Sequence, residues 1–172
     1  MLRPETLKAL GRAFKQRIDQ KEREYDRLAM RHERPKMGRA QWAGTKAQDP
    51  WIEEDLKRCC GICKRLVQSD VMSAVSNLGG PRRTDALAVI DGEIVQFELK
   101  RSDYGGSRVW QQLNAQVFDL GLGTYNATAL VVIYGEDRRI DVYKRDDARR
   151  AVDATQRRSG GFEVPAPTEI RF

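Results

Sequence analysis

Three charged side chains lie around two apolar runs in the stretch TDALAVIDGEIVQFELK. Asp85 opens the first run, and Glu98 and Lys100 end the second. Because side chains alternate across a strand, Glu98 and Lys100 should point to the same face, next to Asp85 on the neighbouring strand. Two adjacent carboxylates repel each other, and a divalent cation between them relieves that cost. Mg²⁺ binds one or two carboxylates together with water and phosphate oxygens, and Lys100 could act on an attacking water or on phosphate charge.

A simpler interpretation of the same residues is an ion pair. Glu98 and Lys100 are two residues apart and could pair at the surface end of a sheet without any ligand. Asp91-Gly92, between the two apolar runs, predicts a tight hairpin that places Asp85 beside the end of the second strand. The sequence therefore predicts a cluster of the three side chains, whichever interpretation holds.

Apolar periodicity and turn residues predict an α/β fold. Pro4 and apolar residues at helical spacing indicate a helix over residues 4–32, and loss of periodicity indicates a linker over residues 31–50. The elements expected after it are helix 51–68 capped by Asp49, strands 71–77, 85–91 and 93–100, helix 107–123, strands 128–135 and 139–145, and helix 146–158. A crossover helix should make the strand at 128–135 parallel to its neighbour. The order α-β-β-β-α-β-β predicts a three-layer fold with a mixed central sheet flanked by helices.

Length and composition fit one soluble domain. The chain has 172 residues, of which 40% are hydrophobic and 33% are charged. No apolar run approaches the roughly 20 residues that cross a bilayer, and the first residues are too charged for a signal peptide. We therefore expect no membrane partner and a cytoplasmic location.

Positive charge is concentrated at the N-terminal end. Residues 1–46 hold 13 Lys and Arg against 6 Asp and Glu, whereas the remaining residues have a net charge of −1. Such a basic helical arm could attract nucleic acid, although a solvated basic helix would look the same. Its apolar stripe could pack on the domain, on a second copy or along DNA. We divide the chain into a basic helical arm and linker, residues 1–46, and a catalytic domain, residues 47–172.

The cysteines do not form a metal motif. Cys59, Cys60 and Cys63 lie close together, but zinc needs four ligands and the single histidine, His32, is far away in sequence. An iron–sulfur cluster would need a fourth cysteine, which a second chain would have to supply. Small hydrophobic core residues are the favoured interpretation.

An aspartate, twelve residues, then Glu-x-Lys, after an acidic helix, resembles the PD-(D/E)xK nuclease superfamily. The similarity covers about residues 52–144 and is greatest to archaeal-type Holliday-junction resolvases and to small phage or VRR-NUC-like nucleases. Thr84-Asp85 replaces the Pro-Asp of the motif, but the metal-binding aspartate is kept. The resemblance implies a restriction-endonuclease-like core behind the N-terminal arm.

The resemblance also implies a Mg²⁺ site, in which Mn²⁺ would substitute. Asp85, Glu98 and the backbone carbonyl of Leu99 would be ligands, and Lys100 would orient the attacking water. No covalent intermediate is needed, so the absence of a Ser-His or Cys-His set is consistent with this chemistry.

The resemblance implies a further carboxylate on the first helix of the core. Glu53, Glu54 and Asp55 are candidates, and at 100° per residue Glu54 lies opposite the apolar face while Glu53 and Asp55 flank it. The resolvase pattern selects Glu53, as a catalytic and metal-binding residue, with Asp55 second. All three could instead be acids favoured at a helix N-terminus.

Several polar residues near this site could contact DNA. They are Arg82, Arg83, Arg101, Arg108 and Gln112. Guanidinium groups bind phosphate through two parallel hydrogen bonds, and Gln112 lies beside the apolar face of its helix. Each could also be an ordinary surface residue.

The function expected from these residues is Mg²⁺-dependent DNA endonuclease activity, structure-specific if the chain acts like a Holliday-junction resolvase. A nickase, an exonuclease or a restriction-like nuclease on the same fold is the alternative within enzymes. A catalytically idle DNA-binding or assembly protein is the alternative outside them. A homodimer is expected only if the substrate is a four-way junction, because cutting it needs two active sites.

Overall fold

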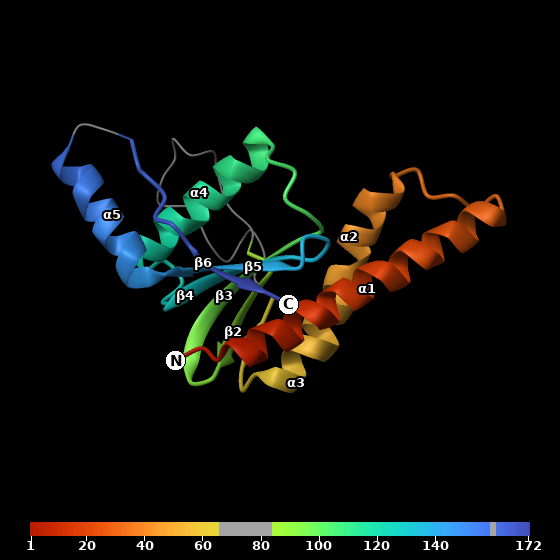
Figure 1. The fold of residues 1–172 in the computed structure, drawn as a ribbon, viewed down its shortest axis with the longest axis horizontal. Helices are drawn as coiled ribbons and strands as arrows, with labels where there is room; N and C mark the ends of the chain where they lie inside the picture. The colour runs from red at the N-terminus through yellow and green to blue at the C-terminus, as the bar shows by residue number, and fades with distance from the viewer. Residues whose placement is uncertain (66–83, 159–160) are drawn as a thin grey trace.

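The computed structural model describes residues 1–65, 84–158 and 161–172 (Figure 1). They form an α/β fold around an open mixed sheet of six strands in the order β1-β2-β3-β4-β5-β6. The strands are β1 Cys63–Lys64, β2 Ala86–Ile90, β3 Glu93–Lys100, β4 Ala129–Tyr134, β5 Arg139–Lys144 and β6 Thr168–Arg171. The helices are α1 Pro4–Met30, α2 Arg39–Pro50, the π-helical segment η1 Trp51–Leu56, α3 Lys57–Cys59, α4 Ser107–Leu122 and α5 Arg145–Arg157. The strand expected at residues 71–77 lies outside the described residues.

Local turn chemistry forms the hairpin of β2 and β3. Asp91 and Gly92 have φ angles of 51° and 80°, which Asp and Gly adopt more readily than most residues. The strands pair antiparallel, with Ala86 opposite Phe97. The predicted hairpin is therefore confirmed, and Asp85, which directly precedes β2, lies beside the end of β3.

Helix α4 is the predicted crossover between β3 and β4. It ends at Gly123, whose φ of 76° is the left-handed conformation that commonly terminates helices. Strands β3 and β4 pair parallel, with Glu98 next to Val132 and Lys100 next to Tyr134. Paired residues of neighbouring strands share a face, so Glu98 and Lys100 lie on the face that α4 covers.

Helices cover both faces of the sheet. Helices α1 and α2 lie on one side and α4 and α5 on the other (Figure 1). Val131 and Ile133 of β4 belong to the apolar cluster under α1, whereas Leu130 and Val132 belong to the cluster under α4 and α5. This explains why β4 is apolar throughout. None of the described helices is long and apolar enough to cross a membrane.

The N-terminal helix packs on the core. Leu10, Phe14 and Ile18 are buried in the same apolar cluster as residues of β3. Trp51 donates its indole N–H to the carbonyl of Leu10 at 2.9 Å, and its ring meets that of Phe14 edge-on with centroids 6.1 Å apart. The sequence left three surfaces open for the apolar stripe of α1: the domain, a second copy or DNA. In the structure the stripe packs on the domain.

Residues 39–50 form a helix where the sequence predicted a linker. Ala43, Gly44 and Ala47 are buried, and a Cβ added to Gly44 would lie 3.0 Å from the Cβ of Arg101. Small residues here therefore allow close packing. Pro50 lies inside the helix, and because proline has no N–H to donate, the regular ladder gives way to η1 directly after it. The sequence predicted one helix over residues 51–68, but in the structure the helical segment that follows Pro50 ends at Cys59.

Candidate active site

Asp85 lies against the end of β3. Its Oδ2 accepts a hydrogen bond from the backbone N–H of Leu99 at 2.7 Å. The electric field at Asp85 includes contributions from Glu98, Lys100 and Arg65. The structure thus brings together the three residues that the spacing predicted.

Glu98 is buried and fully engaged by polar neighbours. Its Oε1 lies 2.8 Å from Nζ of Lys100 and accepts a hydrogen bond from Nε2 of Gln112 at 3.0 Å. Its Oε2 accepts from Nε2 of Gln116 at 2.8 Å. Lys100 in turn donates to Oε1 of Gln112 at 2.8 Å. This network fixes the rotamers of both Glu98 and Lys100.

Gln112, which the sequence predicted to contact DNA, bridges Glu98 and Lys100 in the structure. Gln116 has a matching role that the sequence analysis missed. A signal for it was present, because residues four apart on a helix lie on the same face and Gln116 follows Gln112 by four.

The electrostatics of the two carboxylates suit a divalent cation. Burial and then the nearby charge of Glu98 raise the pKa of Asp85 to about 7, against the opposing effects of the Leu99 N–H, Lys100 and Arg65. A cation close to both carboxylates would remove this cost. Two carboxylates and the carbonyl of Leu99 are hard oxygen ligands of the kind Mg²⁺ prefers, so these residues fit that ion.

Helix α2 reaches the same site through Gln48. Its Nε2 donates to the carbonyl oxygen of Leu99 at 3.4 Å, the atom expected to ligate metal. The next residue, Asp49, pairs with Arg65, whose charge acts on Asp85. Sequence reasoning missed Gln48 because it assigned this segment to a linker.

The carboxylates expected from the helix lie elsewhere. Glu53 is exposed and pairs with Lys57. Asp55 is buried between Arg17 and Arg58. Among the described residues, Glu53 does not gather with Asp85 and Glu98 within the distances of a shared ion. The π-helical geometry of η1, which the sequence did not predict, changes the rotation of these residues about the helix.

Of the arginines expected to contact DNA, the structure describes the side chain of Arg101. Arg101 donates to Oε1 of Glu22 on α1 at 2.8 Å and to the hydroxyl of Tyr104 at 2.9 Å, so it ties the end of β3 to α1. Arg108 belongs to the first turn of α4, and its side chain lies outside the described part of the structure. Arg82 and Arg83 also lie outside it.

A second acidic cluster lies between α1 and the turn after β4. Carboxylate oxygens of Asp19, Glu22 and Glu136 lie within 4.8 Å of one another. Lys15 is 2.5 Å from Asp19 and 3.2 Å from Glu136, and Arg101 pairs with Glu22. Basic side chains therefore already neutralise these carboxylates.

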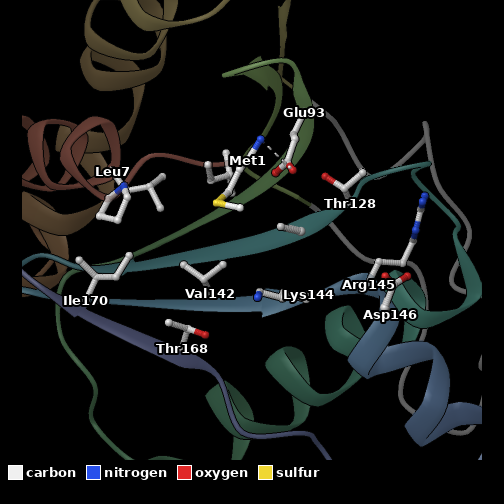
Figure 2. Close-up of a pocket in the computed structure, with 13 residues that line it drawn as sticks. Met1, Leu7, Glu93, Thr128, Val142, Lys144, Arg145, Asp146, Thr168 and Ile170 are labelled. Carbon is white, nitrogen blue, oxygen red and sulfur yellow. Dashed lines mark ion pairs between the residues drawn. The ribbon is translucent and has the colours of Figure 1, made fainter.

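A cavity of about 500 Å³ lies at the other end of the strands, under the N-terminus (Figure 2). The amino group of Met1 lies 3.4 Å from Glu93, the first residue of β3, as the dashed line in Figure 2 marks. Lys100 is the last residue of the same strand, and Glu98 lies two residues before it. This cavity is therefore separate from the candidate active site.

The cysteines are held as thiols. Cys59 is exposed, whereas Cys60 and Cys63 are partly buried against the core under α1. Burial, followed by the neighbouring Cys63, raises the pKa of Cys60 to about 11. A role as small core residues fits Cys60 and Cys63 but not Cys59.

Comparison with known proteins gives no match to any family model, curated protein or solved structure.

Proposed function

We propose that the chain is a Mg²⁺-dependent deoxyribonuclease of the PD-(D/E)xK type. The observation that carries the proposal is the clustering of Asp85, Glu98 and Lys100 at the open end of the β2–β3 hairpin, away from its Asp-Gly turn. There, burial and the neighbouring charge of Glu98 raise the pKa of Asp85. An isolated surface ion pair would need neither the second carboxylate nor its burial. The sequence of elements from α2 to β5 supports a restriction-endonuclease-like core.

In this proposal each residue of the site has a separate role in phosphodiester hydrolysis. Asp85, Glu98 and the carbonyl of Leu99 would hold Mg²⁺, which when bound supplies positive charge at the phosphate. The Lys100 amine, fixed beside Glu98, would orient the attacking water and donate a hydrogen bond to the developing phosphate charge. Gln112 and Gln116 of α4 hold Glu98 in one orientation through hydrogen bonds, as groups that hydrogen-bond to metal-ligating side chains commonly do. Attack in line with the leaving oxygen would leave 5′-phosphate and 3′-hydroxyl ends.

A basic stripe supports DNA as the substrate. Arg23, Arg27 and Arg31 are exposed and spaced by four residues, so they share one side of α1 near its end. This end of α1 and the start of α2 project beyond the sheet (Figure 1). Exposed arginines in such a row neutralise phosphates and give salt-dependent affinity for a nucleic acid backbone.

The test is a cleavage panel of plasmid, single-stranded, flap and four-way-junction DNA with Mg²⁺ or Mn²⁺. The wild type should cut at least one substrate, and Asp85→Asn and Glu98→Gln should not. Glu93→Gln is the matched control, because it makes the same change at the other end of β3 and should keep activity.

The panel also separates the alternatives. Conversion of plasmid to its nicked form would identify a nickase, and progressive shortening from DNA ends would identify an exonuclease. Cleavage of the four-way junction would identify a junction endonuclease. DNA binding without cleavage, together with no calorimetric signal for Mn²⁺, would refute the nuclease and favour a catalytically idle DNA-binding protein.

A further inference from the structure

A second cavity of about 500 Å³ lies beside the start of α4, over β4 and β5. Its walls come from the loop after β3, from the first two turns of α4 and from the two strands. Gly105 and Gly106 line it on the loop side, where they leave room because they have no side chain. The volume lies in the range of pockets that hold small organic ligands.

The walls of this cavity are aromatic. Trp110 lines it from α4 and is 60% exposed, which is unusual for an indole that could have been buried. Tyr134 and Tyr143 line it from the sheet, and the guanidinium of Arg139 lies 4.3 Å from the centre of the Tyr134 ring. Because both tyrosines are buried and Arg139 covers the Tyr134 ring, Trp110 is the aromatic side chain of this cavity on which a planar ring could stack.

Two charged side chains of β5 also line the cavity. Asp141 is only 6% exposed, and its Oδ1 lies 3.2 Å from Nε of Arg139. The two atoms are not aligned for a hydrogen bond, and over residues 1–65, 84–158 and 161–172 neither has another hydrogen-bond partner. Asp103 accepts from Arg139 at 2.7 Å and fixes its position. Asp141 and Arg139 therefore bring a carboxylate and a guanidinium, paired with each other, to the wall of the cavity, and a ligand that offers both a donor and an acceptor matches this pair.

The cavity lies next to the candidate active site. Tyr134 is the parallel partner of Lys100, and Arg139 is the antiparallel partner of Tyr134. With strands about 4.8 Å apart, Arg139 begins roughly 10 Å from Lys100 on the same face of the sheet. A nucleic acid strand at Lys100 could therefore also reach the cavity.

We propose that this cavity is a base pocket, in which an unpaired nucleobase of the substrate strand stacks on Trp110 and hydrogen-bonds to Asp141 and Arg139. The pocket rests on the proposed nuclease function and narrows its substrate to DNA with an unpaired nucleotide near the cleaved bond. A base offers groups that match the cavity: a flat ring for Trp110, an amino donor for the carboxylate of Asp141 and a ring or carbonyl acceptor for the guanidinium of Arg139. Fully paired DNA cannot present these edges there without flipping a base out.

The test measures binding by fluorescence anisotropy in EDTA, so that neither metal nor cleavage contributes. The probes are four labelled single-stranded oligonucleotides that each carry a different base at the centre, the same backbone with its central bases removed, and the duplex. The wild type should bind the base-bearing strand about tenfold more tightly than the abasic strand, because stacking contributes about that much per base. Trp110→Ala should abolish this preference for every base, and Asp141→Asn should change which base is preferred. Leu122→Ala, an exposed apolar residue at the other end of α4, should leave the preference unchanged.

Equal binding of the base-bearing and abasic strands by the wild type would overturn the base pocket. An unchanged preference in both Trp110→Ala and Asp141→Asn would also overturn it. A base preference in a protein that cleaves no substrate would support the base pocket and refute the nuclease. Cleavage without a base preference would support the nuclease and refute the base pocket.

Discussion

Replacement of Asp85 by Asn should stabilise the metal-free protein, and the stabilisation should grow with pH. Burial and the charge of Glu98 raise the pKa of Asp85 from 3.8 to about 7, so the folded state holds this proton more tightly than the unfolded state. The free energy of unfolding therefore falls as pH rises from about 4 to about 7, and it stays lowered above that. At about 1.4 kcal/mol per pKa unit, the cost is at most about 4 kcal/mol at pH 8 and about 2 kcal/mol at pH 5. Asparagine removes the charge but keeps an oxygen for the Leu99 N–H.

The measurement is thermal and urea unfolding of both proteins in EDTA at pH 5 and pH 8. The stability difference in favour of Asp85→Asn should be about 2 kcal/mol larger at pH 8, or roughly 4–8 °C in Tm for a chain of this size. Mg²⁺ should raise the Tm of the wild type and not that of the variant.

Asp91→Asn is the matched control. Hydrogen bonds from Arg3 lower the pKa of Asp91 below its ordinary value of 3.8, so its carboxylate is ionised in both the folded and the unfolded protein at pH 5 and at pH 8. The same substitution in the same hairpin should therefore destabilise the protein by about the same amount at the two pH values. A difference between wild type and Asp85→Asn that is equal at both pH values would refute a buried, repelled carboxylate at residue 85.

Four other variants test separate parts of the structure. Lys100→Met should lose cleavage while calorimetry still detects Mn²⁺ binding, because the amine is proposed to act on water and phosphate. Gln116→Leu leaves one oxygen of a buried carboxylate unpaired and should cost about 1–3 kcal/mol in urea unfolding. Phe14→Ala, at a buried ring of the core, should cost about 3–5 kcal/mol in the same assay. Replacing Arg27 and Arg31 together by Ala should weaken duplex binding and lower the slope of log affinity against log salt by up to about 2, measured over a salt series.

The parts of the fold that local chemistry determines could be predicted from the sequence. Asp91-Gly92 adopts positive φ angles wherever two apolar strands need a tight turn, so the hairpin and the meeting of Asp85 with Glu98 followed from neighbouring residues. The alternation of side chains then placed Lys100 beside Glu98. None of these steps depended on a distant segment.

The parts that depend on tertiary packing could not be predicted. The apolar stripe of α1 showed that one face is buried but not which surface covers it. Residues 31–50 were interpreted as a linker, whereas in the structure Gly44 allows close approach to Arg101 and Pro50 marks the change from α2 to a π-helix. Once α2 was missed, the contact of Gln48 with the carbonyl of Leu99 was missed too.

These packing contacts change how the basic N-terminal segment has to be tested. Gln48 touches the Leu99 carbonyl, Gly44 lies against Arg101, and Arg101 is held by Glu22, so α1 and α2 support the end of β3 from one side while α4 supports it from the other. Deleting residues 1–46 would expose the core and release the candidate active site together, and the resulting loss of DNA binding would have two causes. Substitutions confined to the exposed arginines of α1 leave these contacts in place. They therefore measure the contribution of charge to DNA binding by itself.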